Sequence, residues 1–474
     1  MDRREFVQWA HELVDWMGWY YEHIEEFPVR SQVEPGEILQ KLPPAPPEGS
    51  EDFQQILADF REIILPGITH WQHPRFFAYF PANSSYPSVL AEMLTATLAA
   101  QGMIWQTSPA ATELEERVME WLRDLTGLPE DFHGVIQDTA STSTLVALLT
   151  AREVKTGFRG NEEGLFGLPA MTVYASEQTH SSIEKGVKIA GFGRQNYRTI
   201  GVDGNYAMKP EELEAAIIRD EEAGYTPCCV VATIGTTGST AIDPLPEIVA
   251  VAKRHGLWVH VDAALAGSAL VLPEMRFMIR GIEGVDSFTF NPHKWLFTNF
   301  DASAYFVRDR EALLHTFEIH PEYLKTREGR AVNNYRDWGI QLGRRFRSLK
   351  LWFVLRSFGA GRIREIIREH LRLAEELSQQ IDAEADFERL APTPLNTVCF
   401  HYLPQGVQDP EEINRRNREL LERVNDSGAA YLTHTSLDGV FTIRFVVGQT
   451  NVEERHVRET WELIRETARE TGPS

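Results

Sequence analysis

The segment "FTFNPHKWLFTNFD", residues 288–301, places one lysine, Lys294, among aromatic and apolar side chains. A lysine desolvated by neighbours such as Phe290, Trp295 and Phe297 loses part of its preference for the ammonium form. The neutral amine can form a Schiff base with a carbonyl group. The segment therefore predicts a lysine that reacts with a carbonyl compound, although a lysine in such a setting can also simply extend its amino group to the surface.

Three other groups occur where a strand ends or a helix begins. Asp262 stands at the end of the apolar run in "VHVDAA", His180 lies in "SEQTHSS", and Ser141 lies in the hydroxyl-rich "IQDTASTSTLVALL". The N–H groups and the dipole of a helix N-terminus favour a phosphate. Taken alone, each residue has an ordinary structural interpretation: Asp262 as a cap or turn residue, His180 as a hydrogen-bonded side chain, and Ser141 as an N-cap.

Together, these groups meet the needs of a carbonyl cofactor with a phosphate tail. Lys294 can form the Schiff base, Asp262 can keep a pyridine nitrogen protonated, and His180 can stack on the ring. The hydroxyl-rich helix start can hold the phosphate. This set predicts pyridoxal phosphate. The chain has no GxGxxG after a strand, no GxxxxGK[ST], no HExxH and no GxSxG, so the chemistries typical of those motifs fit less well.

Short apolar runs alternate with helix-length segments between about residues 110 and 310. The runs cover residues 171–176, 228–235, 257–264, 286–290 and 303–307. Runs of this length, flanked by Gly, Asp or Pro, predict an α/β fold with a mainly parallel sheet covered on both faces. Ligands in such folds bind beyond the carboxyl ends of the strands, which is where the candidate residues stand.

The two ends of the chain predict smaller units. Residues 6–24 and 53–64 carry apolar side chains three and four positions apart, which predicts two amphipathic helices joined through the proline-rich linker 41–50. These segments cannot bury both apolar faces by themselves, so they pack on the main domain or on a second subunit. A long helix from about residue 360, two strands at 396–403 and 440–447, and a final helix predict a small α+β domain.

The composition excludes several classes of function. With 474 residues and 43% hydrophobic content, the chain can form two or three folded units. Acidic residues outnumber basic ones by 69 to 47, which argues against nucleic acid as a partner. No apolar stretch is long enough to span a membrane, and the N-terminus does not resemble a secretion signal. The three cysteines, Cys228, Cys229 and Cys399, fit neither a disulfide framework nor a metal site, which predicts a cytoplasmic protein without a metal.

The sequence closely resembles the group II pyridoxal-phosphate amino-acid decarboxylases, specifically the aromatic-L-amino-acid decarboxylases. The matching motifs run through almost the whole chain: "HWQHPRFFAYFPANSSYPSVLAEML", "TASTSTLVALL", "HSSIEK", "GTTGST", "HVDAALAGSA", "FNPHKWL", "PEYLK" and "LGRRFRSLKLWFVLRSFG". The resemblance implies the type I fold of pyridoxal-phosphate-dependent transferases with a mainly parallel seven-stranded sheet. It also implies a helical dimerisation segment at 1–85, a large cofactor-binding domain at 86–360, a small α+β domain at 361–474, and an intertwined homodimer.

The resemblance assigns roles to individual residues. Lys294 matches the Schiff-base lysine, Asp262 the pyridinium partner, and His180 the ring-stacking histidine. Tyr323 matches a loop tyrosine that reaches the partner subunit's active site and protonates the substrate α-carbon. The other implied cofactor contacts are Ala140, Ser141, Thr237, Ala264, Asn291, His293 and Gly343. The implied substrate pocket consists of Trp71, Tyr79, Phe80, Pro81, Ala82, Met103, His180 and Gly343.

The resemblance implies an aromatic L-amino acid as the substrate, with tryptophan expected first. Relatives that use histidine or tyrosine often carry Ser at the position of Gly343, and Gly leaves room for an indole or a catechol. 5-Hydroxytryptophan, dopa, tyrosine and phenylalanine are therefore also expected substrates. Three residues depart from the pattern: Ala82 stands where animal members have Thr, and Gln101 and Met103 replace apolar or aromatic residues.

Other functions fit the motifs less well. An aromatic acetaldehyde synthase uses the same cofactor, but in relatives with that activity Phe replaces the loop tyrosine or Asn replaces the stacking histidine. Tyr323 and His180 are both present here. A decarboxylase for acidic substrates would need a basic pocket, whereas the stretch at 71–81 is aromatic. A catalytically idle cofactor-binding protein would be suggested by loss of Tyr323 or Lys294, and neither is lost.

Overall fold

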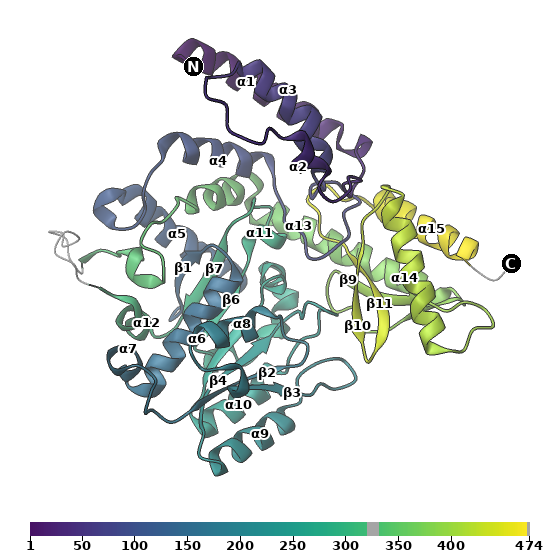
Figure 1. The fold of residues 1–474 in the computed structure, drawn as a ribbon. Coiled ribbons are helices and arrows are strands. Elements are labelled where there is room, and N and C mark those ends of the chain that lie inside the picture. Colours follow the sequence, from purple (N-terminus) through teal and green to yellow (C-terminus); the bar gives the residue numbers. More distant parts are fainter. Residues whose placement is uncertain (320–330, 472–474) are drawn as a thin grey trace. The chain divides into compact units, whose positions relative to one another are not determined.

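The computed structural model of the chain describes residues 1–319 and 331–471 (Figure 1). The chain divides into two compact units. The smaller unit consists of Met1–Pro81, Glu376–Leu390 and Cys399–Ser474, and the larger consists of Ala82–Glu375 and Ala391–Val398. The three-part division expected from the resemblance, with boundaries at 85 and 360, remains a prediction.

A seven-stranded sheet forms the centre of the larger unit. Its strands are β1 (His133–Gln137), β2 (Met171–Ser176), β3 (Tyr197–Ile200), β4 (Thr226–Thr233), β5 (Trp258–Asp262), β6 (Ser287–Phe290) and β7 (Ser303–Val307). Their order is β1-β7-β6-β5-β4-β2-β3. Strand β7 runs antiparallel to β1 and β6, and every other neighbouring pair is parallel. The expected α/β fold with a mainly parallel seven-stranded sheet is confirmed.

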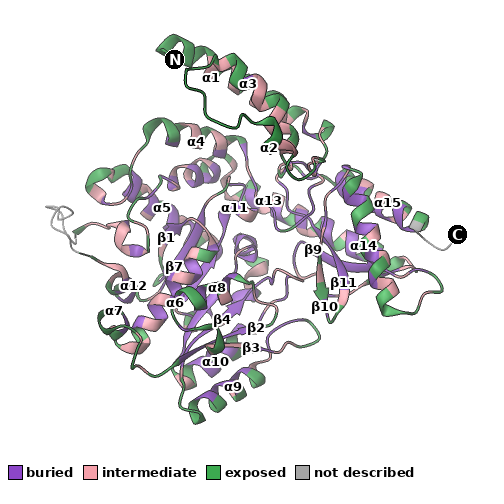
Figure 2. Ribbon diagram, in the orientation of Figure 1, coloured by how far each residue is buried: buried purple, intermediate pink, exposed green. Residues whose placement is uncertain are grey.

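Helices pack against this sheet and bury its strands. The main ones are α5 (Pro109–Thr126), α6 (Ala140–Thr156), α9 (Pro210–Glu222) and α10 (Leu245–His255), and α8 (Ser182–Ile189) packs on α6. All residues of β2, β5, β6 and β7 are buried, as the purple strands of Figure 2 show. Because a strand covered on both faces has no solvated side, these strands appear in the sequence as continuous apolar runs.

The smaller unit contains the N-terminal helices and a second sheet. Its helices include α1 (Arg3–Glu22), α2 (Glu37–Lys41), α3 (Phe53–Asp59), α14 (Pro410–Asp426) and α15 (Glu454–Thr471). The sheet has the order β10-β11-β9-β8, formed by β8 (Phe387–Arg389), β9 (Thr397–Tyr402), β10 (Thr433–Leu437) and β11 (Val440–Val446). Within this sheet β10 and β8 are edge strands.

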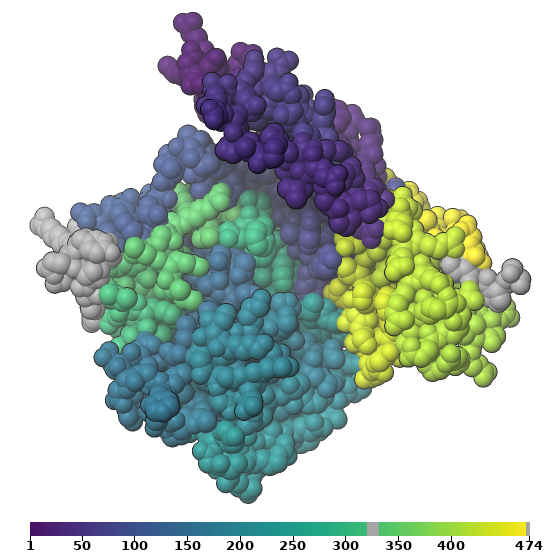
Figure 3. Space-filling model, viewed as in Figure 1, coloured from purple at the N-terminus to yellow at the C-terminus, as the bar shows by residue number. Residues whose placement is uncertain are grey.

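Helix α1 lies against α3 and leaves much of its apolar surface exposed. The ring of Trp9 lies 5.3 Å from that of Phe53, and the ring of Trp16 lies 5.3 Å from that of Phe60. None of the 20 residues of α1, all of them described, is buried, and Phe6 and Trp19 remain exposed. Figures 2 and 3 show this helix as a largely exposed N-terminal segment. The two predicted amphipathic faces therefore cover each other only in part.

Helix α13 (Ser348–Ala383) consists of two helical segments joined at a kink. Gly359 interrupts it with a φ of 68°, a value in the left-handed region that glycine adopts without a steric penalty. The second helical segment follows this break, so the long helix predicted from about residue 360 is confirmed. The sequence prediction did not include the helical segment from Ser348 to the kink.

Among the described residues, no helix is long and apolar enough to cross a membrane.

Candidate active site

Lys294 lies on a single helical turn directly after β6. This turn, α11 (Pro292–Trp295), begins with Asn291 as its N-cap and Pro292 at its first position, where proline loses no hydrogen bond. Trp295 is fully buried, and its Nε1 donates to His370 Nδ1 at 2.8 Å. Lys294 itself is half-buried. The buried tryptophan therefore anchors the turn that presents the lysine.

Asp262 is the last residue of β5, the strand next to β6. The Asp262 side chain is 4% exposed, and its Oδ1 accepts a hydrogen bond from the Ala264 N–H at 3.0 Å. The N–H of Asn291 donates to the Ala264 carbonyl at 2.9 Å, which joins the loop after β5 to the loop that carries Lys294. Two neighbouring strand ends thus place the carboxylate and the lysine at one edge of the sheet.

His180 follows β2 at the same edge. Hydroxyls of Thr179 and Thr233 lie 3.3 Å apart and link its loop to the end of β4. Its Nδ1 lies 2.8 Å from Ser182 Oγ and also accepts the Ser182 N–H at 3.2 Å. The residue is exposed as a whole, so part of its ring faces the open side of the site.

The ionisation of His180 depends on the other two residues. Desolvation lowers the pKa of His180, the positive charge of Lys294 lowers it further, and the negative charge of Asp262 partly opposes both effects. The three side chains therefore lie close enough for their charges to interact. Because its pKa is lowered, the histidine is a neutral ring at pH 7, and a neutral ring can stack on a planar group without bringing in a charge.

The N-terminus of α6 lies at the end of β1. Thr139, not Ser141, is the N-cap, and its side chain makes no capping hydrogen bond. Ser141 is exposed within the first turn, beside Ala140. The first-turn N–H groups of a helix have no intrahelical acceptor, so this helix start offers donors to an anion. The N-cap interpretation of Ser141 was wrong, and its hydroxyl is available for another contact.

Thr237, Ala264 and His293 are the other expected cofactor contacts. Thr237 and Ala264 are half-buried in the loops after β4 and β5. His293 is buried, and its Nδ1 accepts the Ala302 N–H at 2.9 Å. Desolvation, with Lys294 as the next cause, lowers the pKa of His293 to about 3, so its imidazole is neutral at pH 7.

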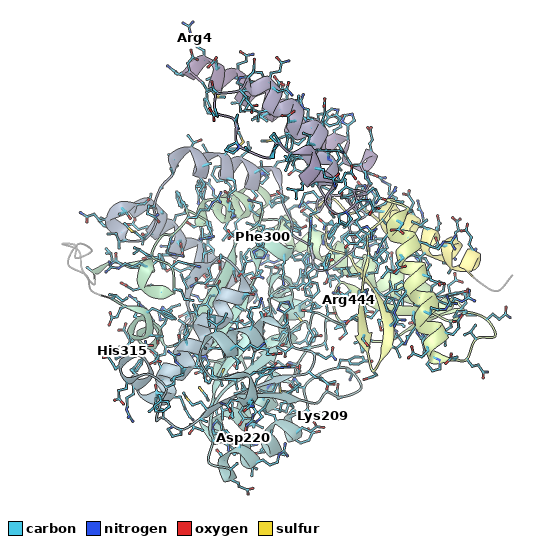
Figure 4. The ribbon with its side chains drawn as sticks, in the orientation of Figure 1. Arg4, Lys209, Asp220, Phe300, His315 and Arg444 are labelled. Carbon is cyan, nitrogen blue, oxygen red and sulfur yellow. The ribbon has the colours of Figure 1, made fainter. Side chains whose placement is uncertain are left out.

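The sequence did not predict a second segment that holds the lysine loop. The N–H of Asn83 donates to the His293 carbonyl at 2.9 Å, and Ser85 Oγ donates to the Phe297 carbonyl at 2.7 Å. Further along, Asn299 N donates to Ser88 Oγ at 2.8 Å. The loop ends near the exposed Phe300, which Figure 4 labels. The hydroxyl-rich "ANSSYPS", residues 82–88, which leads into the first turn of α4 (Tyr86–Leu98), was the available signal for this segment.

Comparison with known proteins identifies the family. The pyridoxal-dependent decarboxylase conserved domain matches residues 35–403. The chain belongs to the pyridoxal-dependent decarboxylase family. It is therefore a pyridoxal-phosphate-dependent carboxy-lyase, as the resemblance in its motifs implied.

Named relatives of this decarboxylase match it along almost its whole length. Phenylacetaldehyde synthase of Arabidopsis thaliana is 45% identical, over 99% of this chain and 96% of the relative. Tryptophan decarboxylase 2 of Oryza sativa is 43% identical, over 99% and 95%. Tyrosine decarboxylase 4 of Petroselinum crispum is 42% identical, over 99% and 94%. These relatives include aromatic amino-acid decarboxylases and an aldehyde synthase.

Solved structures also match this chain along almost its whole length. The Oryza sativa enzyme titled TDC, solved with PLP and tryptamine, superposes with a TM-score of 0.97 at 37% identity and covers 100% of this chain and 99% of that chain. The Rhodiola rosea 4-hydroxyphenylacetaldehyde synthase superposes with a TM-score of 0.92 at 36% identity, and covers 99% of each chain. The overall fold is therefore shared by decarboxylases and an aldehyde synthase.

The residues of the site fit pyridoxal phosphate, the cofactor of this family. Within the described chain, Asn291 Oδ1 is buried without a hydrogen-bond partner, so a bound polar group would satisfy it. The start of α6 supplies donors for a phosphate, and Asp262 supplies a buried carboxylate whose charge, like that of Lys294, acts on His180. Each part of the cofactor thus has a complementary group among these residues.

The expected substrate residues fall in both units. In the smaller unit, the rings of Trp71 and Tyr79 stack at 5.7 Å, and both Phe80 and Pro81 are buried. In the larger unit, Ala82 and Met103 are half-buried and Gly343 is exposed. Tyr323 lies outside the described residues, as does most of the 324–334 loop.

The low pKa of His293 predicts a pH dependence of folding stability. A histidine whose folded-state pKa lies below its unfolded value adds stability that is fully present above about pH 6.5 and is lost as the pH falls towards 3. Unfolding free energies measured between pH 7 and pH 4 should therefore fall less steeply for His293→Gln, by up to about 1.4 kcal/mol per pH unit. The same change at the exposed His11 should leave the slope unaltered, and equal slopes for all three proteins would contradict the burial of a neutral His293.

Proposed function

We propose that this enzyme decarboxylates aromatic L-amino acids to the aryl amine and carbon dioxide. The observation that carries the proposal is that Lys294, Asp262 and His180 lie at one edge of the sheet. The charges of Lys294 and Asp262 both act on the pKa of His180. Bound pyridoxal phosphate supplies the electron sink for the pair of electrons that remains when carbon dioxide leaves. The roles proposed below for the surrounding residues follow from their burial and position.

Lys294 holds the cofactor between turnovers and, because it is half-buried, keeps its amine away from bulk water. Asp262 keeps the pyridine nitrogen of the cofactor protonated. Its negative charge acts strongly on that nitrogen, because water cannot screen a carboxylate that is 4% exposed. The neutral His180 ring provides a flat face for stacking. The first turn of α6, with Ala140 and Ser141, holds the phosphate. Thr237, Ala264, Asn291, His293 and Gly343 complete the proposed set of cofactor contacts.

Tryptophan is the first proposed substrate. The stacked Trp71 and Tyr79 support an aromatic side chain, since flat rings favour an aryl group. Gly343 supports a large ring, because this position carries no side chain that would reduce the space for an indole. 5-Hydroxytryptophan, dopa, tyrosine and phenylalanine are the other proposed substrates. The other proposed substrate contacts are Phe80, Pro81, Ala82 and Met103.

The amine product is favoured over the aldehyde by Tyr323. We propose that its phenol delivers the proton to the substrate α-carbon after carbon dioxide leaves. Without this proton, oxygen and water can react at that carbon to give the aldehyde, ammonia and hydrogen peroxide. The 45%, 43% and 42% identities of the three relatives are too similar to decide between the products, so the choice depends on individual residues.

Tyr323→Phe should change the product rather than simply stop the reaction. The variant holoenzyme, supplied with tryptophan in air, should form mainly indole-3-acetaldehyde and equimolar peroxide, whereas the native enzyme forms tryptamine. Mass spectrometry and a peroxide assay measure both products. Tyr225→Phe, a change at a partly exposed tyrosine, is the control. Tryptamine as the main product of Tyr323→Phe at the native rate would remove Tyr323 from the proposed mechanism.

We further propose a homodimer in which Tyr323 serves the partner's site. Helix α4 supports it with an apolar stripe at a spacing of four residues, whose members are exposed by 45–63%: Tyr86, Leu90, Leu94 and Leu98. The exposed apolar residues of α1 support it as well, because surfaces of this kind mark interaction sites. The cytoplasmic location also remains a proposal, supported by three cysteines that are all buried and free.

A further inference from the structure

Gln101 occupies the space beside Gly343, although the two residues lie far apart in the sequence. A Cβ atom added at residue 343 would lie 3.4 Å from Gln101 Nε2. The space that a side chain at 343 would take is therefore bordered by an amide group. Both residues are exposed, so a ligand can reach this amide.

The orientation of the amide is fixed by its other hydrogen bond. Gln101 Oε1 accepts the backbone N–H of Arg344, and the Gly102 N–H donates to the Arg344 carbonyl at 3.0 Å. Rotating the amide would bring its NH₂ group against the Arg344 N–H, so the oxygen must face Arg344 and the nitrogen must face outward. In the described residues, Nε2 has no hydrogen-bond acceptor, and it presents its donors beside Gly343.

A buried ion pair holds this arrangement in place. Arg344 is 7% exposed, and its Nη2 donates to Glu115 Oε1 at 2.7 Å and to the Ile136 carbonyl at 2.6 Å. Its guanidinium lies 4.7 Å from the centre of the Tyr335 ring. The position of the backbone at 344, and with it the position of Gln101, is therefore determined by the core of the larger unit.

The same segment borders the carboxyl edge of the sheet. Gln137, the last residue of β1, donates from Nε2 to the Trp338 carbonyl at 3.1 Å. Gln341 Nε2 lies 3.4 Å from an oxygen of Asp138, which precedes the start of α6. Residues 338–344 thus lie next to the helix start that offers donors to a phosphate, and Gln101 is a polar side chain at the edge where ligands of this fold bind.

We propose that Gln101 is a specificity-determining residue that selects aromatic substrates with a ring oxygen. Its Nε2 donates a hydrogen bond to the hydroxyl oxygen of tyrosine, dopa or 5-hydroxytryptophan, and finds no acceptor on phenylalanine or on the indole N–H of tryptophan. The inference rests on the proposed function and deepens it. Gly343 accommodates a large ring, and Gln101 refines the substrate order proposed above by placing 5-hydroxytryptophan ahead of tryptophan.

Two substrate pairs that differ by one oxygen test this role. We would measure kcat/KM of native and Gln101→Leu holoenzyme with tyrosine against phenylalanine, and with 5-hydroxytryptophan against tryptophan. The ratio of hydroxylated to unhydroxylated substrate should fall about fivefold in both pairs, the effect of one net hydrogen bond, while values for phenylalanine and tryptophan stay within about twofold of native. Unchanged ratios in an active Gln101→Leu enzyme would overturn the inference.

A second variant separates the donor from the contact with Arg344. Gln101→Glu keeps an acceptor for the Arg344 N–H but removes the Nε2 donor. With 4-methoxyphenylalanine, whose ether oxygen can only accept, its kcat/KM relative to phenylalanine should fall below the native ratio by about fivefold. An unchanged ratio would overturn the donor role. If the native enzyme turns over none of the aromatic amino acids, the proposed function itself fails, which is a different result from turnover without selectivity.

Discussion

Lys294→Ala should abolish turnover and the yellow colour of the purified enzyme. Lys294 is the proposed point of covalent attachment, so the variant loses at least about 10⁴-fold in kcat, the scale seen when a covalent catalytic residue is removed. It should also lose the visible absorbance of the lysine-bound cofactor, because the substitution removes the amine that forms the covalent bond. Stopped assays and absorbance spectra of the dialysed protein give the two readouts.

Lys253→Ala provides the matched control for this prediction, because Lys253 is an exposed lysine of the same unit. That variant should keep native colour and activity. A Lys294→Ala protein that stays yellow after dialysis and turns over aromatic amino acids within tenfold of native would show that the cofactor is attached elsewhere.

Asp262→Asn should leave the fold intact and remove most of the activity. The substitution keeps a side-chain oxygen for the Ala264 N–H and removes only the negative charge. Transition-state stabilisation of about 3–5 kcal/mol depends on this charge, by analogy with breaking a buried pair. The value of kcat/KM should therefore fall by roughly 200- to 5,000-fold. Because Asp262 also affects the charge state of His180, the pH–rate profile should shift as well.

Asp243→Asn is the control for Asp262, since both are buried carboxylates that accept backbone N–H groups, Asp262 from a residue just after β5 and Asp243 from the last residue of β4. Asp243 is 1% exposed and accepts from Thr233 at 2.7 Å and from Met208 at 2.8 Å. Its replacement should lower the free energy of unfolding by about 1–3 kcal/mol and leave kcat/KM within a few-fold. Near-normal turnover of Asp262→Asn would contradict the proposed role of Asp262 in keeping the pyridine nitrogen protonated.

The sequence predicted the buried strands and missed the weaker ones. Strands β2, β4, β5, β6 and β7 are apolar runs because they are covered on both faces. Strand β3, "YRTI", is at the edge of the sheet with one buried residue, and β1, "HGVIQ", contains a glycine and polar ends. Neither segment is an apolar run of the length that predicts a strand from the sequence. Both are strands because they pair with a neighbouring strand, and not because of their local composition.

The candidate site was predictable wherever the chemistry sits at a strand end or helix start. Lys294, Asp262 and His180 follow this rule, because a parallel sheet brings the ends of its strands together. Two sets of contacts join segments that are distant in the sequence: the contact of Gln101 with Arg344, and the hydrogen bonds that Ser85 donates to the lysine loop and that Ser88 accepts from it. No local pattern encodes such contacts, so the tertiary structure was needed to find them.

The most direct test of the proposed decarboxylation is a product analysis of the holoenzyme with an equimolar mixture of amino acids. The mixture contains tryptophan, 5-hydroxytryptophan, dopa, tyrosine, phenylalanine, histidine and glutamate, and mass spectrometry follows amines and aldehydes over time. The holoenzyme should form aryl amines without aldehyde or peroxide. Aldehyde with equimolar peroxide would make the protein an aldehyde synthase despite Tyr323, and products from histidine or glutamate alone would contradict the aromatic pocket.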